Sequence, residues 1–221
     1  MKKLIEVSEK IRDKKLRKMI VDFLRDLNLS NKDFSKYPKM KIEDASSVFT
    51  VGGPTGASSA ERDVLNHTLS LVELCETTAD VFEKAYGLTL NRDNLIAAAI
   101  LHDLMKVFEW KRGSEGLEHT GIMLDHSTLA VAELYHRGFP EDIIHIIAAH
   151  FGDSGPTPPR NFEALIFHHL DNMTSMVEFR MYGTDVQKPV QLVLLDEESL
   201  KKLGEIPEIK ETSREVSKKS K

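Results

Sequence analysis

The sequence predicts an all-α protein, with a helical bundle preceded by an N-terminal helical extension. Apolar residues recur at helical spacing through most of the chain, and capping residues, glycines and prolines separate these segments. The expected division is a loop-rich helical extension over residues 1–57 and the bundle over residues 58–183. A strap and a charged tail are expected over residues 184–221.

Composition limits the class of protein. A chain of 221 residues suits one sizeable domain with extensions, and a net charge of −5 creates no strong field toward nucleic acid or anionic membranes. The single cysteine, Cys75, favours a reducing compartment, and we expect it to be a packed core residue. No apolar stretch approaches the roughly 20 residues that span a bilayer, so we expect a cytoplasmic protein with no membrane partner.

The N-terminal region is expected to hold one helix and a long connection. The helix is predicted over residues 3–27, where apolar residues form a stripe among many charges. Residues 28–59 contain several glycines and prolines and are expected to be a long, loop-rich connection that could include one short element. The sequence GGPTG within them lacks the Lys-Ser/Thr ending of a P-loop and indicates a plain turn.

The bundle is expected to open with two long helices. Residues 58–61, Ser-Ser-Ala-Glu, match a capping box and predict the start of a helix that stops at Gly87. The next helix is predicted to begin near Asn91 or Asp93 and to contain residues 97–110, AAAILHDLMKVFEW. A polar loop, KRGSEGLEHTG, follows it.

Three further helices complete the predicted bundle. One begins near Asp125 and ends before Gly138, and Pro140 then fits the first turn of the next. Residues 151–160 contain several prolines and glycines and are expected to be irregular. The last helix is predicted over residues 161–183.

The C-terminal segment is less defined by its sequence. Residues 186–195 are compatible with a strand or with an ordered strap. The tail from Pro207 is strongly charged with few apolar residues, so we expect it to be mobile.

Each predicted helix of the bundle carries one ligand-type residue or an adjacent pair. In chain order these residues are His67, His102 with Asp103, His126, His150 and Asp171. Metal sites in helical bundles are built from such side chains converging from facing helices, and imidazole with carboxylate suits Mn, Fe, Co, Ni or Zn. Burying Asp103 is costly without a compensating cation. Lys106 shares its helical face and would stand beside an anionic substrate.

The other histidines carry weaker signals. His136 and His145 are expected at the surface. Of His168 and His169, one could pack while the other lines the site. His119 lies in the polar loop, where it could face solvent or substrate.

The ligand order resembles that of the HD superfamily of metal-dependent phosphohydrolases. Its defining order is His, His-Asp and a distant Asp, and here His67, residues 102–103 and Asp171 match it. His126 and His150 fall where dinuclear branches place two more histidines. HDLMKVFE looks like the HDxxKxxE signature, and GIMLDH, AAHFGDSGPTPP and EALIFHHLDNM look like segments of HD-domain bacterial 3'-5' exoribonucleases.

The chain also departs from that exoribonuclease branch. His150 is followed by Phe151, where those enzymes usually carry a second histidine. They also carry an N-terminal OB-fold, whereas residues 1–57 begin as a helix and lack the required run of short strands. The resemblance, over residues 60–180, therefore implies an HD-domain bundle more strongly than it implies RNA as the substrate.

The resemblance implies a phosphohydrolase, expected to be a phosphodiesterase that acts on a nucleotide or a nucleic-acid 3' end through metal-activated water. It implies one or two divalent ions, Mn, Fe, Co, Ni, Zn or Mg, held by the six ligand-type residues, with Asp103 bridging if there are two. Asp103 and Lys106 are the expected catalytic residues, the lysine stabilising charge on the phosphoryl oxygens. The substrate-binding candidates, from loops near helix ends, are Arg112, His119, Thr120 and Arg160.

Other functions share these residues. A 5'-nucleotidase or a cyclic-nucleotide phosphodiesterase would keep every ligand and differ only in its pocket. The segment after the helix with Asp171 has no GYP-type motif, which argues against the cyclic di-nucleotide branch. A regulatory HD domain would bind a nucleotide without turnover, but such domains usually lack a ligand and this chain lacks none. A homo-oligomer is compatible with the charged N-terminal segment and tail.

Overall fold

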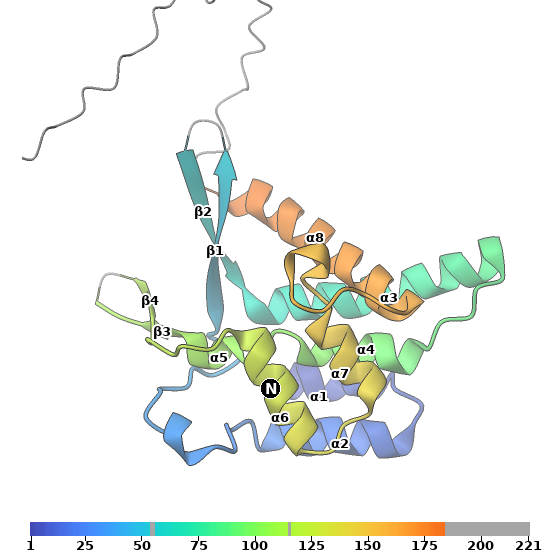
Figure 1. Cartoon of the computed structure of the whole chain (residues 1–221), viewed down its shortest axis with the longest axis horizontal. Coiled ribbons are helices and arrows are strands. Elements are labelled where there is room, and N and C mark those ends of the chain that lie inside the picture. Colours follow the sequence, from blue (N-terminus) through green and yellow to red (C-terminus); the bar gives the residue numbers. More distant parts are fainter. Residues whose placement is uncertain (54–55, 115, 184–221) are drawn as a thin grey trace, which may run out of the picture. The chain divides into compact units, whose positions relative to one another are not determined.

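The computed structural model describes residues 1–53, 56–114 and 116–183, and they confirm the all-α class (Figure 1). These described residues belong to one compact unit. The strands within the described residues form two small hairpins only. The expected strap at residues 186–195 and the tail from Pro207 lie outside the described residues.

The N-terminal extension contains two helices where one was predicted over residues 3–27. Helix α1 spans Lys2–Ser8 and α2 spans Lys14–Arg25. The single helix is wrong because the Asp13 side chain accepts hydrogen bonds from the amides of Lys15 and Leu16, which starts a new helix. A 3-10 turn, η1, follows at Lys32–Phe34. Whether residues 1–57 form a separate domain stays a prediction, although apolar side chains of α1 and α2 share one core with α4.

A hairpin occupies the stretch that was expected to be mostly loop. Strand β1, Ser46–Gly53, pairs antiparallel with β2, Gly56–Asp63, and Ser47 lies opposite Arg62. Residues 58–61 therefore do not begin a helix, and the predicted capping box is wrong. The Asp63 side chain caps α3 instead, by accepting a hydrogen bond from the Asn66 amide at 2.6 Å.

The bundle helices end where their capping residues indicate. Their bounds are α3 Val64–Tyr86, α4 Arg92–Leu101, α6 His126–His136, α7 Glu141–Ala148 and α8 Phe162–Tyr182. The side chains of Asn91, Asp125 and Asn161 cap the starts of α4, α6 and α8. Gly87 ends α3 with a φ of 65°, a conformation that a Cβ atom disfavours. A 3-10 turn, η2 (Gly152–Ser154), lies in the otherwise irregular segment after α7.

Helix α4 lies at the centre of the core. Its last seven residues are buried, and it contacts α1, α2, α3, α7 and α8. This apolar run anchors the turn that follows it, so the site is attached to the most buried element of the bundle.

The chain breaks its helix at the predicted site residues. Residues 97–110 were expected in one helix, but α4 ends at Leu101 and residues 102–105 form a turn before α5, Lys106–Glu109. The turn is tightened by a bond of 3.0 Å from the Lys106 amide to the Asp103 carbonyl. Strand β3, Trp110–Arg112, then pairs with β4, Leu117–His119.

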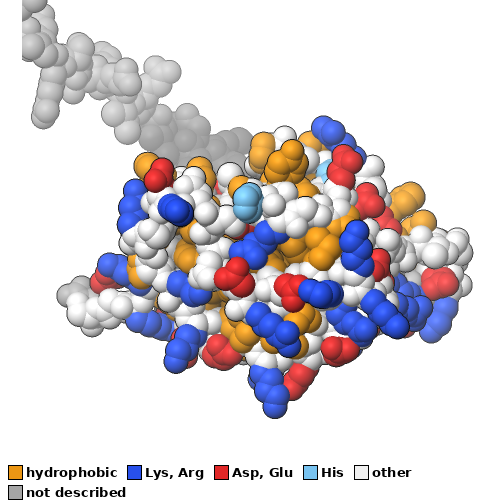
Figure 2. Space-filling view, turned by 90° about the horizontal axis from the view of Figure 1, so that it is seen from below, with side chains coloured by type: hydrophobic (Ala, Val, Ile, Leu, Met, Phe, Trp, Pro, Cys, Tyr) orange, Lys and Arg blue, Asp and Glu red, His pale blue; other side chains and the backbone are white. Residues whose placement is uncertain are grey.

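The surface carries both signs of charge. Figure 2 shows the underside of the view in Figure 1, where Lys and Arg side chains lie among Asp and Glu side chains. None of the described helices has the length and apolarity needed to cross a bilayer. Cys75 is fully buried, as predicted, and burial raises the pKa of its thiol to about 12.

Candidate metal centre

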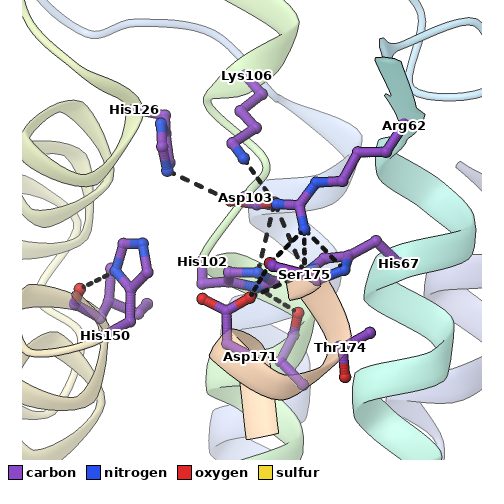
Figure 3. Close-up of polar contacts among 12 residues, drawn as sticks. Arg62, His67, His102, Asp103, Lys106, His126, His150, Asp171, Thr174 and Ser175 are labelled. Atoms are coloured by element: carbon purple, nitrogen blue, oxygen red, sulfur yellow. Dashed lines mark hydrogen bonds and ion pairs between the residues drawn. The ribbon is translucent and has the colours of Figure 1, made fainter. Parts of the chain in front are cut away.

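The six ligand-type residues converge from five elements of the bundle, and four of them line one cavity: Asp103, His126, His150 and Asp171 (Figure 3). They come from α3, the turn after α4, the start of α6, the turn after α7, where His150 lies beyond the helix that was predicted to include it, and α8. They form two groups, one of His67, His102 and Asp171 and one of Asp103, His126 and His150, with ligand atoms no more than 4.8 Å apart within each group. All six are buried, which places charged and polar atoms where only a compensating partner makes them stable.

Three of the histidines have one ring nitrogen held and the other turned toward the site. The Nδ1 atoms of His102 and His150 donate to the Ala99 and Ile147 carbonyls at 2.9 and 2.6 Å. The His126 Nδ1 lies 3.1 Å from Glu109 Oε1. This is the arrangement by which histidine ligands of metals are oriented, with the free nitrogen left to bind the ion.

Two buried ring nitrogens indicate that the site fits a metal. Nε2 of His102 and Nε2 of His126 are buried and have no hydrogen-bond partner. A buried polar atom without a partner costs about 1–3 kcal/mol. Both atoms are lone-pair donors of the kind that divalent transition metals bind. The donor set present in the chain therefore fits one or more divalent ions.

Burial and charge keep four of these groups in the protonation states of ligands. Burial lowers the pKa of His102 to about 3 and lowers that of His150, so both are neutral near pH 7. Burial acts to raise the pKa of Asp103, but the cations of Lys106 and Arg62 outweigh it and hold that pKa well below its ordinary value. For Asp171, the hydrogen bond with His67 likewise overcomes burial and lowers the pKa.

Without metal, the protein is expected to lose stability as the pH falls from 6.5 to about 5. In this window the unfolded chain protonates His102 while the folded protein does not, so stability rises with pH; the difference is about 2 kcal/mol. His150 acts in the same direction. The pKa of His67 is raised, because its bonds to Asp171 and Glu178 outweigh burial, so below pH 6.5 it is protonated in both states and adds no slope.

Thermal unfolding in chelator at the two pH values measures this effect. His102→Gln is expected to flatten the dependence, whereas His136→Gln, which changes an exposed histidine of α6, is expected to keep it. Equal melting temperatures of the wild type at both pH values would contradict a buried, neutral His102.

Asp103 connects the two groups. Its Oδ1 lies 3.3 Å from Nε2 of His126 in the second group. Its Oδ2 faces the first group, 3.5 Å from Nε2 of His102, and also lies 3.0 Å from the Lys106 ammonium. A carboxylate with one oxygen toward each group can contact both at once.

Three charged residues at the site were not predicted to act there. Arg62 of β2 reaches Asp103 Oδ2 at 2.8 Å, and Glu178 of α8 lies 2.9 Å from Nδ1 of His67. Glu109 holds His126 and is the last residue of the HDxxKxxE pattern, so a sequence signal for it existed. Arg62 and Glu178 match no local pattern, and only the folded structure brings them to His67.

The cavity has a volume of about 430 Å³ and a mixed lining. Besides the charged groups it is lined by aromatic side chains, Phe49, Trp110 and Phe151. Phe151 is 40% exposed, and its ring lies 4.0 Å from that of His150. His168 also lines the cavity and donates from Nδ1 to the His150 carbonyl at 2.7 Å, while His169 is exposed.

The four predicted substrate-binding residues are not among those lining this cavity. Arg112 pairs with Glu61 at 2.9 Å, and the Thr120 hydroxyl donates to the Phe108 carbonyl at 2.7 Å. His119 and Arg160 are exposed. Their role in substrate binding stays a prediction.

The two histidines expected at the surface differ. His136 is exposed, as predicted. His145 is half-buried, because its Nε2 accepts a hydrogen bond from the Arg160 amide at 3.0 Å and so holds the segment after α7.

Comparison with known proteins agrees with the geometry. The HD domain family model matches residues 64–176. The chain is 37% identical over 179 residues to the dihydroneopterin 2',3'-cyclic phosphate phosphodiesterase of Methanocaldococcus jannaschii, covering 80% of this chain and 70% of that protein. It is 32% and 31% identical over 136 residues to the 3'-5' exoribonucleases YhaM of a Geobacillus species and of Bacillus subtilis.

The extent of these matches differs. The exoribonuclease matches cover 56% of this chain but only 40% and 41% of the two relatives. No solved structure matches the chain. The family match spans half of the chain and contains all six ligand-type residues in the expected order. The chain therefore belongs to the HD domain family, the metal-dependent phosphohydrolases that its ligand order resembles.

Proposed function

We propose that this protein is a divalent-metal-dependent phosphodiesterase that opens a small cyclic phosphodiester, such as the 2',3'-cyclic phosphate of a pterin or a nucleoside. The observation that carries the proposal is the 430 Å³ cavity, in which ligand-type residues, cations and aromatic rings face one space. Its size is in the range of small-molecule sites. The archaeal relative named for such a substrate supports this choice over a polymer.

The two groups of ligand-type residues suit two ions. His67, His102 and Asp171 would hold one, His126 and His150 the other, and Asp103 would contact both. Imidazole and carboxylate donors favour Mn, Fe, Co, Ni or Zn over Mg. When bound, such ions polarise the phosphoryl oxygens and lower the pKa of a water molecule.

The protein side chains would bind and orient the substrate. Lys106 is nearly buried and lines the cavity, where its ammonium can donate to phosphoryl oxygens and offset their charge. Trp110 and Phe151 lie beside the ligand-type residues and offer apolar rings to a heteroaromatic base. Glu109 keeps Nε2 of His126 directed at Asp103, so the imidazole cannot turn away during the reaction.

A panel of substrates tests the proposal. Pterin and nucleoside 2',3'-cyclic phosphates, 5'-nucleotides and short 3'-labelled RNA would be compared under each metal. The cyclic phosphates are expected to have kcat/KM values at least about 100-fold above those of RNA and 5'-nucleotides. Phe151→Ala is expected to raise KM for the cyclic substrate, and Phe162→Ala, which removes an exposed ring of α8, serves as the control.

Three results would overturn the proposal. Faster release of nucleotides from RNA would favour an exoribonuclease, and hydrolysis of 5'-monoesters alone would favour a nucleotidase. Tight binding of a nucleotide without turnover under every metal would favour a regulatory HD domain.

A further inference from the structure

Arg62 places a guanidinium among the ligand-type residues (Figure 3). It lies at the end of β2 and is only 6% exposed. Its Nη2 donates to Asp103 Oδ2 at 2.8 Å, and its Nη1 donates to the Ser175 hydroxyl at 2.7 Å. Nη1 also lies 2.9 and 3.2 Å from the two ring nitrogens of His67. A guanidinium carries hydrogen-bond donors only. Arg62 therefore occupies the position toward which the lone pairs of Asp103 and His67 point.

One carboxylate oxygen of Asp103 already contacts two cationic side chains. Asp103 Oδ2 is bound by Arg62 at 2.8 Å and by Lys106 at 3.0 Å. A divalent ion that binds the group of His67 and also takes this oxygen brings a third positive centre to the same atom. Like charges at such distances in a buried site repel strongly. One of the resident cations must therefore move when the ion binds.

A second cavity offers the Arg62 side chain an alternative position. This side chain lines both the site cavity and a separate cavity of about 340 Å³. The second cavity is also lined by three carboxylates, those of Glu61, Asp63 and Glu178. Nη1 of Arg62 already lies 3.2 Å from Glu178 Oε2, so the guanidinium keeps an anionic partner if it leaves Asp103. Lys106 lines the site cavity but not the second one.

We infer that Arg62 is a resident cation that competes with the metal ion for Asp103 and moves toward Glu178 when the His67 group is loaded. The inference rests on the metal centre of the proposed function. It makes Arg62 a positioning residue that sets metal affinity, because it compensates Asp103 and excludes the ion from the same oxygen.

Titration calorimetry with Mn²⁺ on the metal-free full chain tests this role. Arg62→Gln removes the competing charge and is expected to bind Mn²⁺ about tenfold more tightly than the wild type. Arg62→Lys keeps the charge but lacks the second nitrogen that reaches Asp103, and is expected to bind about threefold more tightly. Arg17→Gln is the matched control, since Arg17 of α2 pairs with Glu9 at 2.9 Å and lines neither cavity, and the affinity of this variant is expected to stay unchanged.

The outcomes separate the two proposals. If the wild type takes up no Mn²⁺ or other divalent transition metal, the metal centre itself is wrong. If the wild type binds Mn²⁺ and the Arg62 variants bind it equally or more weakly, the competition is wrong and Arg62 only supports the fold. Should Arg62→Gln fail to fold, the Arg62→Lys affinity decides alone, because a purely structural role predicts weaker binding and competition predicts tighter binding.

Discussion

Replacing Asp103 by asparagine is expected to lower kcat/KM for the phosphodiester by at least about a thousandfold. The oxygens of Asp103 face both ligand groups, at 3.3 Å from His126 and 3.5 Å from His102. Asparagine keeps the size of the side chain but removes its charge and one acceptor. The loss therefore falls on metal binding and on the charge balance of the site, while helix packing is preserved.

Steady-state kinetics and far-UV circular dichroism together measure this effect. Asp142→Asn, which neutralises an exposed carboxylate in the first turn of α7, is the matched control and is expected to keep wild-type activity. A helical Asp103→Asn protein with more than about a tenth of wild-type kcat/KM would contradict a central role for Asp103.

The candidate ligands could be predicted because each lies in, or directly after, a well-marked helix of the bundle. His67, His126 and Asp171 lie in helices whose ends carry capping residues or glycines. The helices could therefore be located in the sequence, and one ligand-type residue in each of them predicts a shared site in the bundle. Arg62 and Glu178 gave no such signal. They are separated by 116 residues, and their contact depends on β2 and α8 packing side by side, which no local pattern encodes.

The errors in the fold arose where two local signals competed. Residues 58–61 match a capping box, but Asp63 offers a better cap because its carboxylate reaches the Asn66 amide, and the preceding residues are then free to pair with β1. At residues 102–105 no proline or glycine announces the break in the helix. The turn is explained by the tertiary structure and not by the local sequence, because it lets His102 and Asp103 face different ligand groups.

Removing the metal is expected to abolish activity and to lower the melting temperature by about 5–10 °C, an effect reversed by adding metal back. The size follows from the roughly 2.7 kcal/mol gained when free metal is at 100 times its Kd. The structural reason is that metal would satisfy the unpartnered nitrogens of His102 and His126 and compensate buried carboxylates. Dialysis against chelator, metal analysis and differential scanning calorimetry measure both effects on one sample.

Two histidine variants show whether the stabilisation arises at this centre. His150→Gln removes a buried candidate ligand and is expected to lose most of the metal-induced rise in melting temperature. His136→Gln removes an exposed histidine and is expected to keep it. Full activity in protein with less than about 0.1 metal ion per chain would reject metal dependence. An equal rise in both variants would place the bound ion elsewhere, because a centre built on His150 cannot lose that ligand without losing affinity.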